Sequence, residues 1–401
     1  MSKTNTDQQK IQELMDRGTI VEVLPSKKEF VDRLKSGQKL RLYIGIDATA
    51  PTLHLSHAKN FMLMEKFRQL GHEVIILFGD FTARIGDPTG ENKSRPQLSR
   101  KDVIANIKQW QKLVKPLMGF SDKKNPVKIM YNHSWLSKLS MEDLINLASN
   151  FTVQQIIERD MFQKRLKEKK PIHLHEFLYP LMQGYDSVAM DVDVEVCGTD
   201  QIFNALAGRT LMKKLKNKDK FVVAVTLMEN PKTGELMSKS KGTGVFLDTS
   251  PKDMYGQVMS QPDEMIEILL VNCTLLSLEE IKKIMALPNP RDAKAKLAME
   301  VTKMFHGEKE ALKAEQEFTN IFAKKENPDD MPEFAISQNT ISPVELLLQM
   351  QLVTSKGEAK RLIDGGGLKL NHEKVATWDK DINIKSGDVI QAGKRKFGKI
   401  K

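Results

Sequence analysis

Two histidines, His54 and His57, stand three positions apart where an apolar run gives way to a helical pattern. This spacing places both imidazoles on one face of the first helical turn, beside backbone N–H groups that favour an anion. Two imidazoles at such a place can donate hydrogen bonds to phosphate oxygens. The structural alternative is that His54 caps the turn and His57 packs in the core.

A second group of polar residues, KTGELMSKSKGTG at positions 232–244, combines glycines, hydroxyls and lysines. The flanking glycines allow the segment to open and close. Lys239, and also Lys241, can place positive charge beside a phosphate chain as negative charge builds up during a displacement. An ordinary solvated basic loop is the alternative interpretation.

The elements around the histidines predict a βαβ unit. Residues 40–46 form an apolar run typical of a buried strand, residues 54–70 predict a helix that ends at Gly71, and residues 74–78 predict another strand. Such a unit implies a parallel sheet, whose ligands bind at the carboxyl ends of its strands. Residues 221–225 predict a further strand, and residues 100–163 are mostly helical in pattern.

The pattern changes after Pro251. Strand signals stop, and residues 293–305 predict an amphipathic helix that ends at Gly307. Residues 324–343 lack periodicity and predict a linker. The final 61 residues carry 12 Lys+Arg against 7 Asp+Glu. The predicted domains are therefore 1–248, 249–325 (helical) and 341–401 (a basic module), with a linker at 326–340.

Composition narrows the class of protein. The chain has 401 residues, a formal charge of +10 and only two cysteines, so a polyanionic partner and a reducing compartment are expected. The first 16 residues are polar and no apolar run is long enough to span a bilayer. We therefore expect a cytoplasmic protein that does not bind membranes.

Together the two motifs resemble the signature pair of the class I aminoacyl-tRNA synthetases. Other segments narrow the resemblance to the bacterial tyrosyl-tRNA synthetases: YIGID (43–47), GDFTARIGDPTG (79–90), YPLMQGYD (179–186) and GTDQ (198–201). The segment SKGEAKRLIDGGGLKLN (355–371) is similar to a small RNA-binding module at the end of these enzymes. The resemblance covers the chain from about residue 40 to its end.

The resemblance implies a fold and an activity. The fold is α/β, with a parallel-sheet, Rossmann-like catalytic domain, a helical anticodon-side domain and a small α+β RNA-binding module. The activity is ATP-dependent activation of L-tyrosine to tyrosyl-adenylate and transfer of the tyrosyl group to tRNA(Tyr), with ATP used together with Mg²⁺ and no metal bound by the protein itself. The family also implies a homodimer.

Carried over position by position, the resemblance assigns the site residues. Tyrosine would be bound by Tyr43 and Asp186 at its phenol, by Asp87, Tyr179 and Gln183 at its α-ammonium group, with Gln201 nearby and Glu195 in support. ATP would be bound by Gly45, Asp47, His54, His57, Gly198, Asp200, Ser238 and Lys239, of which His54, His57 and Lys239 would stabilise the transition state.

Each assignment has a structural alternative. Tyr43 could be a core aromatic residue and Asp87 could cap a turn. Tyr179, Gln183 and Asp186 could belong to an ordinary helix, although their spacing aligns three polar groups on one face. Because the motifs occur jointly and in the family's order, we favour function.

Four positions depart from the family pattern. Ser56 replaces the glycine of the first signature, Leu236 replaces the first lysine of the second, and Ala48 and Cys197 replace a proline and a glycine. Leu236 removes one charge near the pyrophosphate, so Lys239 or Lys241 must stabilise more of it. Two alternative functions stay open: the related tryptophan enzyme, and a catalytically impaired paralogue that binds RNA.

The last module presents a basic face. Lys356, Lys360 and Arg361 lie on or near one side of the predicted helix, and Lys396 and Lys399 add basic charge close to the end of the chain. Such a surface would bind phosphates and recognise RNA shape more than sequence. A solvated charged tail is the alternative, which the glycine-rich turn at 365–367 disfavours.

Overall fold

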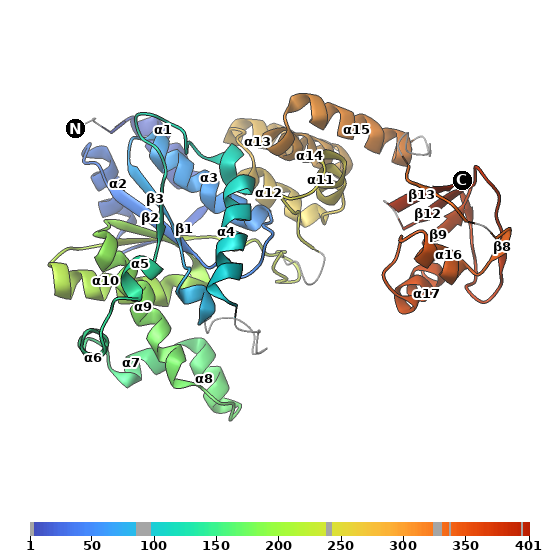
Figure 1. The fold of residues 1–401 in the computed structure, drawn as a ribbon. Helices are drawn as coiled ribbons and strands as arrows, with labels where there is room; N and C mark the ends of the chain where they lie inside the picture. The colour runs from blue at the N-terminus through green and yellow to red at the C-terminus, as the bar shows by residue number, and fades with distance from the viewer. Residues whose placement is uncertain (1–3, 86–97, 238–242, 324–330, 337, 394–395) are drawn as a thin grey trace. The chain divides into compact units, whose positions relative to one another are not determined.

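The computed structural model describes residues 4–85, 98–237, 243–323, 331–336, 338–393 and 396–401 (Figure 1). The positions Asp87, Ser238, Lys239 and Lys241 lie outside the described residues. The chain divides into two compact units, residues 1–308 and 309–401. None of the described helices is long and apolar enough to cross a membrane.

Within the described part of the first unit, six strands form one sheet in the order β1-β6-β5-β2-β3-β4. The strands are β1 Ile20–Leu24, β2 Arg41–Ile46, β3 Glu73–Phe78, β4 Lys128–Tyr131, β5 Val194–Gly198 and β6 Phe221–Val225. The neighbours from β6 to β4 pair in parallel, and β1 pairs with β6 antiparallel. This arrangement confirms the predicted α/β class, with one antiparallel edge added.

The predicted βαβ unit is confirmed. Helix α3 (Leu55–Gln69) connects β2 to β3 and is followed by Gly71, whose φ of +94° is a conformation that glycine adopts readily. Figure 1 shows the sheet between α3 and the pair α9 (Leu174–Met190) and α10 (Ile202–Lys216). The buried residues of β2 and β3 match their continuous apolar sequence, because helices cover both faces.

The remaining helices of the first unit fall into three stretches. The N-terminal helices are α1 Gln8–Asp16 and α2 Lys27–Lys35. Between β3 and α9 lie α4 Arg100–Val114, α5 His133–Leu136, α6 Met141–Ala148, α7 Val153–Ile157 and α8 Asp160–Lys167. After β6 come α11 Pro251–Met259, α12 Ile266–Cys273, α13 Leu278–Met285 and α14 Pro290–His306, so the predicted helical stretch after Pro251 is confirmed.

The second unit begins with α15 (Glu308–Ala323) and ends in an α+β module, as predicted. Its helices are α16 Pro343–Gln349 and α17 Lys356–Asp364. Its strands are β7 Glu333–Phe334, β8 Thr340–Ile341, β9 Leu368–Leu370, β10 Glu373–Lys374, β11 Ile382–Asn383, β12 Val389–Ala392 and β13 Lys396–Ile400. The strand order is β10-β9-β12-β13-β7, with β11 and β8 as a separate pair.

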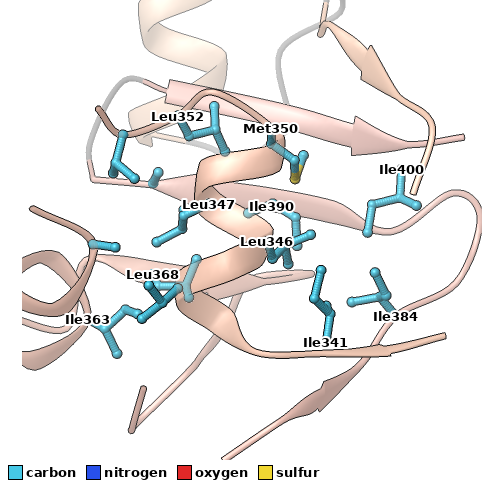
Figure 2. Packing of buried hydrophobic residues seen from close by; sticks show 14 residues of the cluster. Ile341, Leu346, Leu347, Met350, Leu352, Ile363, Leu368, Ile384, Ile390 and Ile400 are labelled. Carbon is cyan, nitrogen blue, oxygen red and sulfur yellow. The ribbon is translucent and has the colours of Figure 1, made fainter. Parts of the chain in front are cut away.

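Figure 2 shows the buried core of this module. Leu346 and Leu347 of α16, Ile363 of α17 and Ile390 of β12 are fully buried and pack together with neighbouring aliphatic residues. The helices and strands of the module therefore share one contiguous apolar core. The interval 326–340, expected as a linker, contains β7, which pairs in parallel with β13.

Candidate active site

A cavity of about 360 Å³ opens at the carboxyl ends of β2 and β5 and beside the first turns of α3. Its position is the one at which open parallel sheets bind ligands. The lining includes ten of the residues expected in the site: Gly45, Asp47, His57, Tyr179, Gln183, Asp186, Glu195, Gly198, Asp200 and Gln201. The fold therefore brings together segments more than 150 residues apart in the chain.

Two expected residues lie next to this cavity without lining it. Tyr43 is completely buried and its ring lies beneath Gly45, where an added Cβ would be 3.8 Å from the ring. His54 stands at the N-cap of α3 and touches the lining residue His57, with ring centroids 4.1 Å apart. Asp87, Ser238 and Lys239 lie outside the described residues, so the structure does not place them.

The two histidines are held as neutral groups. Burial lowers the pKa of His54 to about 4 and that of His57 to about 3, and the proximity of the two rings lowers the His57 value further. The backbone N–H of His54 donates to Nδ1 of His57 over 3.3 Å, so the His57 proton resides on Nε2. His57 can therefore act as a neutral hydrogen-bond donor.

Asp47, at the end of β2, links two sides of the cavity. The Thr82 hydroxyl donates to its Oδ1 over 2.7 Å and the Tyr179 hydroxyl donates to its Oδ2 over 2.9 Å. Gly79 leaves the space for this contact, because a Cβ there would lie 1.9 Å from Asp47 Oδ1. The carboxylate is therefore fixed in orientation by donors from α9 and from the 3₁₀ turn at 82–84.

Asp186 is buried at the inner end of the cavity. Nε1 of Trp135 donates to its Oδ1 over 2.7 Å and Nδ2 of Asn132 donates to its Oδ2 over 3.3 Å. Burial raises the pKa of Asp186 well above its usual value, while these two donors act in the opposite direction. Each oxygen keeps acceptor capacity for one more hydroxyl group.

A buried ion pair between Lys220 and Glu195 lies next to the inner end. Nζ of Lys220 also donates to Oγ of Ser187 over 2.9 Å, and Ser187 Oγ lies 2.9 Å from the Tyr43 hydroxyl. The other oxygen of Glu195 accepts from Nε2 of Gln183 over 2.9 Å. The Lys220–Glu195 pair is therefore connected through Ser187 to Tyr43, which is expected at the phenol of the amino acid. The same pair contacts Gln183, which is expected at the α-ammonium group.

The other end of the cavity is lined by Ser56, Lys59 and Asn60 of α3 and by Asp200 and Leu227. Lys59 is 2% exposed, and its ammonium group donates to Oδ1 of Asn60 over 2.8 Å. Within the described residues no carboxylate lies within 4 Å of this ammonium group. Burial lowers its pKa to about 8.

Three of the four positions that depart from the family pattern lie in or beside this region. Ser56 and Cys197 line the cavity, and Ala48 is completely buried. Leu236 is 48% exposed and pairs with Glu229 in an isolated β-bridge. Leu236 therefore does not pack into the core, and a longer side chain fits at this position.

The basic residues of the last module differ in their surroundings. Lys356 and Arg361 of α17 are exposed, whereas Nζ of Lys360 lies 3.8 Å from the centre of the Trp378 ring. Nζ of Lys396 donates to the carbonyl of Leu352, and Lys399 forms an ion pair with Glu333. These last two lysines therefore contact groups within the module, whereas the sequence predicted that they add to a basic surface that binds phosphates.

Sequence reasoning missed four polar residues that line the cavity, Thr82, Asn132, Lys59 and Asn60. It also missed three residues that contact its lining, Trp135, Ser187 and Lys220. Thr82 belongs to a motif that was recognised, GDFTARIGDPTG, so its polar side chain beside a glycine turn was a usable signal. Lys220 is the last residue of the charged run LKNKDK, which is typical of a solvated surface. No local pattern distinguishes it from its exposed neighbours.

Comparison with known proteins identifies the family of both parts of the chain. Residues 35–323 match the class I tRNA synthetases (W and Y), and residues 324–398 match the tyrosine--tRNA ligase SYY-like C-terminal domain. The tyrosine--tRNA ligase of Thermotoga maritima is 41% identical over 382 residues, which cover 94% of each chain. That of Haemophilus influenzae is 42% identical over 394 residues, which cover 96% of each chain.

Solved structures agree with this match. A C-terminally truncated mitochondrial tyrosyl-tRNA synthetase from Coccidioides posadasii superposes with a TM-score of 0.63 at 25% identity, covering 77% of this chain and 91% of that chain. The corresponding Aspergillus nidulans structure gives 0.64 at 24% identity, covering 78% and 94%. The cavity at the sheet edge, the family match and the full-length relatives lead to one conclusion: the chain belongs to the class I tRNA synthetases of the tryptophan and tyrosine family.

Proposed function

We propose that this protein is a tyrosine–tRNA ligase. It joins the carboxylate of L-tyrosine to the α-phosphate of ATP with release of diphosphate, and then transfers the tyrosyl group to tRNA(Tyr) with release of AMP. The observation that supports tyrosine over tryptophan is the inner end of the cavity, where the buried Asp186 lies beside the hydroxyl network of Tyr43. A phenol satisfies these polar groups, whereas phenylalanine leaves them unpaired.

In this proposal Tyr43 and Asp186 bind the phenol of the substrate. Asp87, Tyr179 and Gln183 bind its α-ammonium group, with Gln201 nearby. Support for this orientation comes from the cavity, in which Asp186 and Gln183 lie one helical repeat apart on α9. The amino acid would then present its carboxylate toward the end that carries His57 and Asp200.

ATP occupies the second end. Gly45, Asp47, Gly198 and Asp200 line it, and Ser238 and Lys239 complete the ATP-binding residues that the family resemblance assigns. A Cβ on Gly198 would lie 2.4 Å from Asp200 Oδ1, so the glycine leaves room for that carboxylate, which faces the ribose in this proposal. The substrate carboxylate is already a nucleophile, so His54, His57 and Lys239 need only orient the phosphates and stabilise developing charge.

Mg²⁺ enters with ATP as a substrate complex. Among the described residues no group of three or more His, Cys, Asp or Glu side chains could hold a metal ion. The ion would therefore be bound mainly by the phosphate oxygens, which are hard ligands suited to it. When bound, it neutralises charge on the leaving diphosphate.

Transfer of tyrosine to RNA tests the whole proposal. The full chain should charge a tRNA(Tyr) transcript with labelled tyrosine and leave a tRNA(Trp) transcript with tryptophan uncharged. Charging with tryptophan would point to the related enzyme. RNA binding without charging of either transcript would favour the catalytically impaired paralogue.

We further propose that residues 1–248 form the catalytic domain, 249–325 a helical anticodon-side domain, and 341–401 an RNA-binding module to which β7, inside the expected linker 326–340, also belongs. Lys356, Lys360 and Arg361 would contact tRNA phosphates. Because β7 pairs with β13, the informative deletion removes residues 331–401 as a whole. We expect it to weaken tRNA charging and to spare adenylate formation, and equal loss of both activities would contradict this division.

The protein is proposed to act as a homodimer in the cytoplasm. Met141 and Ile145 of α6, Val153 of α7 and Leu174 of α9 are 61–78% exposed, an unusual density of apolar side chains on one stretch. Both cysteines are free and buried, as suits a reducing compartment. Light scattering tests the dimer: Ile145→Asp should yield monomers, and an unchanged mass would place the interface elsewhere.

A further inference from the structure

The Lys220–Glu195 ion pair is almost completely buried, and Glu195 borders the cavity. Lys220 lies just before β6 and Glu195 lies in β5, and each residue is 1% exposed. Removing two charges from water is costly, and an apolar pair of similar size often serves stability as well. Stability alone therefore does not account for this pair, and its contacts with the neighbouring pocket indicate another role.

One end of the pair fixes the orientation of Gln183. Oε1 of Glu195 accepts a hydrogen bond from Nε2 of Gln183 over 2.9 Å. A carboxylate only accepts, so Gln183 must turn its NH₂ group toward Glu195. Its carbonyl oxygen is then left as an acceptor for the cavity that Gln183 lines.

The other end fixes the direction of hydrogen bonds at Tyr43. The Lys220 ammonium group only donates, so Oγ of Ser187 accepts from it over 2.9 Å. The Ser187 proton can point to Tyr43 at 2.9 Å or to Glu195 at 3.5 Å. The shorter contact is favoured, and a hydroxyl that accepts from a cation is also a stronger donor. Tyr43 then accepts from Ser187, and its own proton can be donated to the nearby carboxylate of Glu195 or to an oxygen of the substrate.

Gly208 of α10 leaves space for the contact between Lys220 and Ser187. A Cβ at this position would lie 2.6 Å from Nζ of Lys220 and 2.8 Å from Oγ of Ser187. Glycine inside a helix is unfavourable by about 1 kcal/mol relative to alanine. The helix therefore carries a costly residue at the place where the ammonium group and the hydroxyl need space.

We propose that the Lys220–Glu195 pair sets the hydrogen-bond polarity of both ends of the tyrosine pocket, with Ser187 and Gln183 as positioning residues. Through Gln183 it presents an acceptor to the substrate ammonium group. Through Ser187 it makes Tyr43 a donor to the phenol oxygen, while the phenol proton is donated to Asp186. This inference rests on the tyrosine pocket proposed above.

Ser187→Ala tests the phenol end with little change in volume. Amino-acid-dependent ATP–diphosphate exchange is measured with tyrosine and phenylalanine, and the ratio of their kcat/KM values is compared. We expect the ratio to fall about 10-fold, because Tyr43 loses its orienting partner while phenylalanine never used it. Ser260→Ala, an exposed serine that ends α11, serves as the control and should leave the ratio unchanged.

A defect that is only structural would lower both kcat/KM values in proportion, so an unchanged ratio in Ser187→Ala would overturn the proposal. Tyr43→Phe separates this failure from failure of the pocket itself. If Tyr43→Phe lowers the ratio and Ser187→Ala does not, the polarity proposal is wrong while the pocket stands. If neither variant changes the ratio, the pocket assignment is wrong as well.

Glu195→Gln tests the ammonium end. Calorimetry compares binding of tyrosine with binding of 3-(4-hydroxyphenyl)propionate, which lacks the amino group. Glutamine at 195 lets Gln183 turn, so we expect tyrosine to bind about 10-fold more weakly and the deaminated analogue to change less than about 3-fold. Equal weakening of both ligands would contradict the assigned role of Glu195.

Discussion

The hydroxyl of Tyr179 donates a 2.9 Å hydrogen bond to the carboxylate of Asp47, joining the middle of α9 to the end of β2. Family resemblance assigns Tyr179 to the amino acid and Asp47 to ATP. The two proposed substrate sites are therefore in direct contact through this pair. A substitution that breaks the contact should affect both substrates.

Tyr179→Phe removes this hydrogen bond and keeps the ring. We expect kcat/KM for tyrosine and for ATP each to fall about 10-fold, which corresponds to a lost hydrogen bond to a charged group. Thr82→Val removes the second donor to the same carboxylate and is the matched comparison. It should change the ATP value more than the tyrosine value, and the reverse order in exchange kinetics would contradict the assignment.

Acid should destabilise the protein through the two signature histidines. Their folded pKa values, about 4 for His54 and about 3 for His57, lie below the unfolded value near 6.5. The unfolded chain therefore binds more protons between these values, and the free energy of unfolding falls as the pH drops below about 6.5. Urea denaturation of the protein and of His57→Asn between pH 4 and pH 7 measures the slope, which should be shallower in the variant. Identical slopes would mean that His57 is accessible to protons in the folded state.

Lys59→Met should stabilise the protein at pH 7. The folded pKa of about 8 lies below the unfolded value of 10.5, so the charged form is disfavoured by folding. We expect the free energy of unfolding to rise by roughly 1–3 kcal/mol, and this gain to shrink between pH 8 and about pH 10.5.

Lys101→Met, at an exposed position on α4, is the control and should have no effect. Chemical denaturation at pH 7 and pH 10 makes the comparison. A loss of stability in Lys59→Met at pH 7 would show that the ammonium group is better compensated than its single acceptor suggests.

Gly208→Ala should destabilise the protein although alanine is the better helix former. The added Cβ would meet Lys220 and Ser187, both of which are buried. Overpacking of a buried site costs about 1–3 kcal/mol. The same substitution at Gly357 in α17 meets only the flexible end of Arg361 at 3.6 Å and should be neutral or stabilising. Equal effects of the two substitutions on thermal unfolding would argue against a crowded site at Gly208.

The strands and helix that carry strong patterns could be predicted from the sequence. The apolar runs of β2, β3 and β6 and the helix after His54 need no tertiary information. The strands β1, β4 and β5 were not predicted, because each is short and contains a charged residue, Glu22, Lys128 or Glu195, whereas the equally short β6 is entirely apolar. The two-residue strands β7 and β8 exist only through pairing with distant partners.

The residues of the site likewise divide into those that could be assigned from the sequence and those that could not. Tyr179, Gln183 and Asp186 were assigned through the resemblance of the segment YPLMQGYD to the tyrosyl-tRNA synthetases, and all three line the cavity. Ser187 and Lys220 were not recognised, because a serine in a helix and a lysine within a charged run are ordinary in sequence. Their role follows from burial and from contacts between β5, β6 and α9, which only the folded chain shows.

The central claim is tested most directly by amino-acid-dependent ATP–diphosphate exchange with tyrosine, phenylalanine and tryptophan in parallel. The account predicts exchange with tyrosine alone, which would also show that Ser56 and Leu236 are compatible with activation. Exchange with tryptophan in place of tyrosine, or no exchange with any of the three by folded protein, would contradict it.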